Sequence, residues 1–303
     1  MPGRPRFALD AVRQGGGVVV EAGEPADALV WTTWWDVARG LGEALAAQPD
    51  VRWVQLPMAG VEKVGEVGLF SDPSFSHITW TCAKGSYAEP VAEHALCLAL
   101  AGLRQLPVRA RATSWGKPAA VSLYDARVTI LGGGGITRVL LDLLAPFRVR
   151  ATVVRRSPGP LSGADRTVSP EQLHAHLPDA LVVFLALALT PATTHIISEV
   201  ELKLMGRQSW LVNVARGRHV DTAALVSALE DASIGGAALD VTDPEPLPDG
   251  HSLWSMPNCL ITPHSADTEE MTRPLLAGRI RENVERFAAG LPLVGQVDPL
   301  AGY

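Results

Sequence analysis

Cysteine is scarce in this chain, whose 303 residues include only Cys82, Cys97 and Cys259. An odd number of widely spaced thiols provides neither a disulfide framework nor the paired spacing of a zinc site, as is typical of a reducing compartment. Long apolar runs are also missing, because the longest, residues 180–189, is too short to cross a membrane. Residues 1–6 contain no apolar core of a secretory signal. The sequence therefore predicts a cytoplasmic protein.

Surplus positive charge is absent as well, because 26 Lys and Arg residues against 32 Asp and Glu residues give a formal net charge of −6. This balance argues against a general nucleic-acid-binding surface. The sequence also has no internal repeat and no low-complexity tract. Its 47% of apolar residues is sufficient for substantial buried cores, and its length is typical of about two domains.

What the chain does contain is a regular alternation of short apolar runs and helix-like segments, which is typical of parallel sheets wound with helices. Strands of a first, smaller sheet are expected at residues 18–20, 28–32, 52–56 and 78–82. Strands of a second sheet are expected at residues 127–131, 151–154, 181–185, 210–214, 237–241 and 260–261. Helices are expected at residues 89–106, 137–144, 199–205, 222–231 and 268–290, with a loop or arm at residues 109–125.

Three ionisable side chains each lie just past one of these apolar runs. They occur in the segments Asn213-Val214-Ala215-Arg216-Gly217, Asp243-Pro244-Glu245-Pro246 and Thr262-Pro263-His264-Ser265. Because parallel strands end at one edge of the sheet, where ligands bind, we expect Arg216, Glu245 and His264 to face one cleft. A carboxylate beside an imidazole makes a general acid/base whose charged form is stabilised by its neighbour. A guanidinium is a two-pronged clamp for a substrate carboxylate.

A glycine-rich turn follows the expected strand 127–131 and opens a helix, with the sequence Gly132-Gly133-Gly134-Gly135-Ile136-Thr137. Alone, such a turn is as consistent with a flexible loop as with a phosphate site. The strand before it and the acid/base segments after it favour a dinucleotide site, in which small residues let the pyrophosphate approach the helix amides. Thr137 replaces the third glycine of the usual pattern, a position that normally permits close packing of helix on strand.

Together these segments resemble the D-isomer-specific 2-hydroxyacid dehydrogenases, and within them the bacterial glyoxylate/hydroxypyruvate reductases of the A type. The likeness runs over residues 27–303. It also includes Ala28-Leu29-Val30-Trp31, Ala59-Gly60-Val61, Val91-Ala92-Glu93-His94, and the closing Gly295-Gln296-Val297-Asp298 and Gly302-Tyr303. Relative to the family the start is short, so a first strand is either missing or confined to residues 5–9.

The resemblance implies a fold of two doubly wound parallel-sheet domains. Residues 91–265 are expected to form a Rossmann dinucleotide-binding domain. Residues 1–90 and 266–303 are expected to form a discontinuous, smaller, flavodoxin-like substrate domain, to which the final helix returns. The long helix and the following arm join two nucleotide domains in relatives, so a homodimer is expected.

The resemblance also assigns roles to the candidate site residues. The expected activity is reduction of a small 2-oxo acid with a nicotinamide cofactor, His264 being the acid/base, Glu245 its partner and Arg216 the ligand of the carboxylate and carbonyl. Substrate contacts are expected at Trp31, Ala59, Gly60 and Val61. Cofactor contacts are expected at Gly132, Gly134, Gly135, Ile136, Arg155, Arg156, Ser157, Thr190, Ala215 and Asp240. Ala188 replaces a proline common in the family, so a changed loop is expected there.

NADPH is expected to be preferred over NADH, with NAD remaining possible. The expected strand 151–154 runs into Arg155-Arg156-Ser157 and meets no carboxylate before Asp165, whereas a domain that uses NAD usually has an acidic residue at the end of this strand. Two guanidiniums can pair with a ribose 2′-phosphate, although a solvated basic turn would have the same sequence.

Two other functions remain open. One is a dinucleotide-sensing binding protein, against which the intact catalytic set argues. The other is oxidation of D-3-phosphoglycerate, against which Trp31 argues, because phosphoglycerate-using relatives have a basic residue there. The sequence does not rank glyoxylate, hydroxypyruvate and other small 2-oxo acids. No metal site is expected. Among eight histidines only His264 combines a strand-end context with a carboxylate segment, and His94 receives no role.

Overall fold

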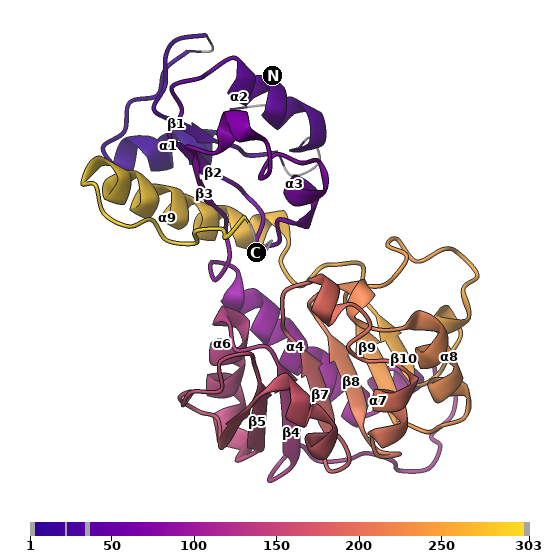
Figure 1. Cartoon of the computed structure of the whole chain (residues 1–303). Coiled ribbons are helices and arrows are strands. Elements are labelled where there is room, and N and C mark those ends of the chain that lie inside the picture. The colour runs from indigo at the N-terminus through magenta and orange to yellow at the C-terminus, as the bar shows by residue number, and fades with distance from the viewer. Residues whose placement is uncertain (1–3, 22, 34–36, 300–303) are drawn as a thin grey trace. The chain divides into compact units, whose positions relative to one another are not determined.

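The computed structural model describes residues 4–21, 23–33 and 37–299, which form parts of two compact units (Figure 1). Unit 1 combines residues 1–87 with residues 268–303, and unit 2 consists of residues 88–267. Gly302-Tyr303 of the family resemblance lies outside the described residues. No helix in the described ranges is long and apolar enough to span a bilayer, and the cytoplasmic location stays a prediction.

Unit 1 is built on a parallel three-stranded sheet in the order β1-β2-β3. Its elements are α1 (Arg6–Gln14), β1 (Ala28–Val30), α2 (Gly42–Ala46), β2 (Trp53–Gln55), α3 (Glu62–Glu66), β3 (Thr79–Thr81) and α9 (Glu269–Ala288). Apolar residues of the sheet, of α2 and α3 and of the segments between them form one core. The C-terminal helix α9 packs against α1, and Phe287 stacks near Trp53 with ring centroids 5.3 Å apart.

A buried polar chain ties α9 to the sheet of unit 1. Thr81 Oγ1 donates to Gln55 Oε1 at 2.9 Å, and the Asn283 side-chain amide of α9 donates to the same oxygen at 2.9 Å. Asn283 also donates to the Val294 carbonyl and accepts from its backbone amide. The buried Asn283 amide therefore has its partners only when α9, the sheet and the segment around Val294 are all in place.

At the start of the chain one expectation is wrong, the strand at residues 18–20, and of the two alternatives for a first strand the structure agrees, within the described residues, with its being missing. Residues 5–9 do not form a strand, because Pro5 precedes helix α1 and its carbonyl accepts from the amides of Ala8 and Leu9. Residues 18–20 are not a strand either. The Val20 carbonyl accepts from the Arg4 guanidinium at 2.5 Å and Val18 is 85% exposed, so an apolar, β-branched run lacks the neighbouring strand that would fix it.

Unit 2 contains a parallel seven-stranded sheet in the order β10-β9-β8-β7-β4-β5-β6. Its strands are β4 (Arg127–Leu131), β5 (Arg150–Val154), β6 (Arg166–Val168), β7 (Val182–Leu185), β8 (Trp210–Asn213), β9 (Gly236–Leu239) and β10 (Cys259–Ile261). Its helices are α4 (Ala88–Leu103), α5 (Leu106–Ala110), α6 (Gly135–Leu144), α7 (Glu199–Leu204) and α8 (Thr222–Glu230). Strand order reverses between β4 and β7, and ligands of such sheets bind at that switch point.

Helix α4 packs against β8, β9 and β10 and beside α6, while α7 and α8 pack on one another elsewhere on the sheet (Figure 1). Gly102 allows α4 its close approach, since a Cβ there would lie 2.3 Å from the Trp210 ring. Strand β6 was not expected. Residues 109 and 110 belong to α5 and not to the expected arm, whereas residues 111–126 contain no helix or strand. The predicted fold class, α/β with parallel sheets in two domains, is confirmed.

Candidate active site

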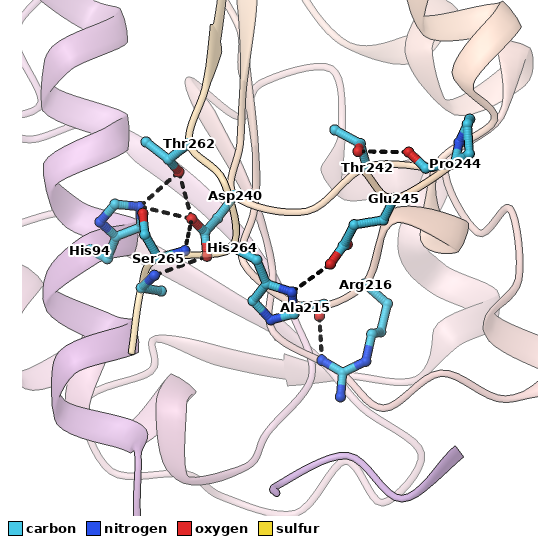
Figure 2. Close-up of polar contacts among 11 residues, drawn as sticks. His94, Ala215, Arg216, Asp240, Thr242, Pro244, Glu245, Thr262, His264 and Ser265 are labelled. Carbon is cyan, nitrogen blue, oxygen red and sulfur yellow. Dashed lines mark hydrogen bonds and ion pairs between the residues drawn. The ribbon is translucent and has the colours of Figure 1, made fainter. Parts of the chain in front are cut away.

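An imidazole and a carboxylate meet at the carboxyl ends of β9 and β10. His264 Nδ1 lies 2.6 Å from Glu245 Oε1 (Figure 2). The hydrogen bond with Glu245 raises the pKa of His264 above its usual value, against the opposing effects of burial and of the Arg216 charge. For Glu245, burial favours the neutral form, but the bond and charge of His264 outweigh it and lower the pKa of the carboxyl. Both shifts favour the ion pair of an imidazolium and a carboxylate, in which Nδ1 donates to Glu245.

Arg216 lies beside this pair because of how the segment 213–217 folds after β8. The Asn213 side chain accepts from the Ala215 amide at 3.0 Å and donates to the Arg216 carbonyl at 2.8 Å, which fixes the turn. Gly217 then packs directly on the Glu245 segment, since a Cβ there would lie 1.9 Å from the Thr242 carbonyl oxygen. The Arg216 guanidinium donates to the Ala215 carbonyl at 2.7 Å and lies on the His264 side of the loop (Figure 2).

The segment that carries His264 has a constrained backbone. His264 has a φ of 50°, in the left-handed region, which is uncommon for residues other than glycine. Its amide donates to the Asp240 carbonyl at 2.8 Å. The Asp240 carboxylate, 2% exposed, accepts from the Thr262 hydroxyl and from the amides of Ser265 and Ala266. Burial acts to raise the pKa of Asp240, but these bonds and one with His94 lower it to about 2.

His94, a residue without an expected role, reaches this network from helix α4. Its Nε2 lies 3.0 Å from Thr262 Oγ1 and 3.3 Å from Asp240 Oδ1 (Figure 2). Spacing along the chain could not identify the contact, because His94 and Thr262 are 168 residues apart. Asp267 is a further titratable group near His264, and burial raises the pKa of its carboxyl.

The glycine-rich turn lies at the switch point, between β4 and α6. Gly132 has a φ of 107°, and a Cβ on it would lie 2.1 Å from the Ala186 carbonyl oxygen, so only glycine fits. Gly134 directly precedes helix α6 and has open space where a Cβ would be. The Thr137 hydroxyl donates to the Gly132 carbonyl at 2.9 Å, so the departure from the third glycine is accommodated inside the turn. This open, amide-rich helix start fits a dinucleotide pyrophosphate.

Arg155 extends from the end of β5 over this turn. A Cβ on Gly133 would lie 2.7 Å from Arg155 Cδ, and Arg155 Nε donates to the Ser157 carbonyl at 2.6 Å. Asp165, the next carboxylate along the chain, accepts from the Ala151 amide at 2.7 Å and so lies at the opposite end of β5.

Further expected cofactor contacts lie in a loop and in a helix of unit 2. Thr190 precedes the 3₁₀ turn Pro191–Thr193, and its amide donates to Thr193 Oγ1 at 2.8 Å. The Ala188 carbonyl accepts from the Thr193 hydroxyl and lies 3.3 Å from His219 Nε2. Ile136 is the second residue of α6 and half-buried. How the replacement of proline by Ala188 changes this loop stays a prediction.

The expected substrate residues lie in unit 1. Ala59, Gly60 and Val61 follow β2 and precede α3, with the Ala59 carbonyl 3.5 Å from Cys82 Sγ. Trp31 directly follows β1, is 4% exposed and packs in the core of this unit. The Trp31 ring is therefore part of the hydrophobic core, and its contact with substrate stays a prediction.

The sequence was compared with those of known families. The model of the D-isomer specific 2-hydroxyacid dehydrogenase NAD binding domain matches residues 94–266. The chain belongs to the D-isomer-specific 2-hydroxyacid dehydrogenase family. This dehydrogenase is an NAD(P)-dependent oxidoreductase, and the family resemblance found in the sequence is confirmed.

Its relatives differ in how far they are characterised. The dehydrogenase is 40% identical over 260 residues, 84% of each chain, to an uncharacterized protein in the proB 3′ region of Corynebacterium melassecola. It is 32% identical over 222 residues, 69% of this chain and 66% of the relative, to a glyoxylate reductase of Aeropyrum pernix. A D-isomer specific 2-hydroxyacid dehydrogenase from Xanthobacter autotrophicus Py2, crystallised with NADPH and MES, aligns over 100% of this chain and 97% of its own with a TM-score of 0.83 and 28% identity.

Proposed function

We propose that this dehydrogenase reduces a small 2-oxo acid of the glyoxylate or hydroxypyruvate class to the D-2-hydroxy acid, with NADPH as the preferred reductant. The observation that carries the proposal is the hydrogen-bonded pair of His264 and Glu245 with Arg216 beside it at the carboxyl edge of β8, β9 and β10. In this proposal residues 91–265 bind the dinucleotide, and residues 1–90 with 266–303 form the substrate domain.

Each side chain has a separate task in the reduction. When bound, the nicotinamide cofactor supplies the hydride that adds to the carbonyl carbon. Glu245 engages His264 Nδ1, so Nε2 is the ring nitrogen that donates a proton to the carbonyl oxygen, and the C=O becomes CH–OH. Arg216 binds the substrate carboxylate and stabilises the negative charge that develops on the carbonyl oxygen.

The substrate is proposed to lack a phosphate group. The segment Val30-Trp31-Thr32-Thr33 offers no cation, and Trp31 lies in the core of unit 1. Together with Arg216, the backbone of Ala59-Gly60-Val61 is proposed to contact the substrate carboxylate. Absence of a charge-assisted contact to phosphate usually forfeits roughly 1.5–3 kcal/mol, which disfavours phosphoglycerate relative to small 2-oxo acids.

The proposed preference for NADPH is supported by the ends of strand β5. Arg155, Arg156 and Ser157 follow its carboxyl end, near the glycine-rich turn, where a ribose 2′-phosphate would find cations. Asp165 is bonded at the amino end of β5, so it does not occupy the place from which a carboxylate would bind a 2′-hydroxyl and repel a phosphate.

The test is a panel of glyoxylate, hydroxypyruvate, phenylpyruvate and 3-phosphohydroxypyruvate, each with NADPH and with NADH, followed by the nicotinamide absorbance. We expect the highest kcat/KM for glyoxylate or hydroxypyruvate with NADPH. Equal kcat/KM for 3-phosphohydroxypyruvate would overturn the substrate class. Tight NADPH binding without turnover on any 2-oxo acid would instead support a dinucleotide-sensing protein.

A further inference from the structure

One histidine of helix α4 contacts residues at the ends of β9 and β10, two strands that come much later in the sequence than α4. His94 is on α4, Asp240 follows β9 and Thr262 follows β10, yet the three side chains form one cluster (Figure 2). The Thr262 hydroxyl donates to Asp240 Oδ1 at 2.5 Å, so its oxygen is the acceptor for the contact with His94. His94 must then hold a hydrogen on Nε2, which lies 3.0 Å from that oxygen.

The Asp240 carboxylate binds the segment that carries His264, the proposed acid/base. Asp240 Oδ1 accepts from the Ser265 amide at 2.9 Å and Oδ2 from the Ala266 amide at 3.1 Å. The Asp240 carbonyl accepts from the amide of His264 itself, the residue with the positive φ. Every one of these donors lies within residues 262–266, so the position of one buried carboxylate determines the turn on which the His264 ring stands.

We infer that His94 is a positioning residue for the proposed reduction, because its hydrogen bond to Thr262 and contact with Asp240 hold the His264 turn in its left-handed conformation. It does not touch the reacting atoms, since His264 and Glu245 form a separate pair. The charged groups around the turn are Asp240, Glu245, Arg216 and Asp267. Within the described residues, His94 is the one imidazole of α4 that contacts Asp240. This inference rests on the proposed function, but the effect of His94 on the conformation of the turn can be measured without turnover.

Two substitutions separate the hydrogen bond of His94 from its volume. His94→Leu fills the space without a donor, whereas His94→Gln keeps an N–H on a side chain of similar reach. We expect kcat of the Leu variant to fall roughly ten-fold, with KM for the 2-oxo acid within about two-fold, and the Gln variant to recover most of the loss. Thr262→Val should give a similar loss, and combining it with His94→Leu should add little, because both remove the same link.

Hydrogen exchange of the backbone amides of residues 262–267, measured by mass spectrometry, gives a readout that needs no substrate. We expect faster exchange in this segment in the Leu variant and near-native exchange in the Gln variant. The matched control is His174→Leu, which removes another imidazole–carboxylate contact of unit 2, with Glu201 at 2.7 Å, and should change neither kcat nor this exchange.

Native kcat in the Leu variant, or equal losses in the Leu and Gln variants, would overturn the inference. So would unchanged exchange of residues 262–267 in the Leu variant. If the native protein binds NADPH but turns over no 2-oxo acid, the proposed function fails, while the exchange measurement still decides whether His94 holds the turn.

Discussion

At the scale of single residues, the proposed chemistry depends on one ring nitrogen. His264 Nδ1 is engaged by Glu245, so only Nε2 can deliver the proton. We expect His264→Ala to lower kcat by roughly 10²–10⁴-fold, the usual contribution of a general acid. NADPH affinity, measured by fluorescence titration, should stay near native because the glycine-rich turn is unchanged. Near-native turnover would show that another group donates the proton.

The same pair predicts how the rate depends on pH. Reduction requires the imidazolium, whose pKa is raised by the bond with Glu245, so the rate should be full below this pKa and be lost as pH rises through it. Glu245→Gln removes the charge, so the alkaline limb of kcat/KM should move to lower pH. Oxidation of the 2-hydroxy acid requires the neutral ring and should show the opposite limb.

The control for this pH prediction is Asp249→Asn, an exposed carboxylate in the same loop, which should leave the profile unchanged. An alkaline limb that stays in place in the Glu245→Gln variant would mean that His264 is not the group that titrates.

A second pair of residues is expected to set the choice of cofactor. Arg156→Ala and Arg155→Asp should each lower the preference for NADPH over NADH about ten- to a hundred-fold, as expected from loss of one charge-assisted contact of roughly 1.5–3 kcal/mol. The comparison is the ratio of kcat/KM with the two cofactors. Arg150→Ala, at the other end of β5, is the control and should keep the native ratio. An unchanged ratio in both variants would exclude these arginines as phosphate ligands.

The sequence identified the strand-end residues of the site but not the residues behind them. Arg216, Glu245 and His264 follow apolar runs, and such a pattern is local enough to see along the chain. The contact of His94 with Thr262 depends on how α4 packs on the sheet, and the spacing of these residues along the sequence does not predict it. Likewise, Asp240 was expected as a cofactor contact, and only the structure shows its carboxylate bonded to the His264 turn.

At the scale of elements, buried strands were predictable and isolated ones were not. Strand β4 has the predicted bounds of 127–131, because it is paired on both sides and its last four residues are buried. Residues 18–20 are three valines, which have high β propensity, but they have no partner strand among the described residues, so propensity alone did not produce a strand. The short β6, with only Val168 buried, gave no apolar run to detect.

The packing of α4 on the sheet leads to a stability prediction. Gly102→Ala would place a Cβ 2.3 Å from Trp210, so we expect the free energy of unfolding to fall by about 1–3 kcal/mol. Gly278→Ala, in helix α9, meets open space and should instead raise it by about 0.4–1 kcal/mol. Thermal unfolding of both variants checks the contrast. A Gly102→Ala protein as stable as the Gly278→Ala protein would contradict this account of how α4 packs.

At the scale of the whole molecule, the prediction is a homodimer. Trp115, in the segment 111–126 after α5, is 96% exposed, and Arg109 donates to the carbonyls of Trp115 and Lys117, which shapes this arm. Light scattering should give twice the chain mass of 32.2 kDa. Trp115→Asp should shift the protein toward monomer, whereas Trp254→Asp, at another exposed tryptophan, should not. A native monomer at micromolar concentration would contradict the prediction.

The way unit 1 is assembled from both ends of the chain has a consequence for its synthesis. The ribosome releases β1, β2 and β3 early, but α9, whose Asn283 and Phe287 contact this sheet, emerges only after the whole of unit 2. Residues 88–267 are continuous, so this middle unit can fold while the C-terminal helix is still being made. Folding order then departs from the order of translation, and the part of the nascent N-terminal sheet that α9 covers stays exposed until α9 has been made.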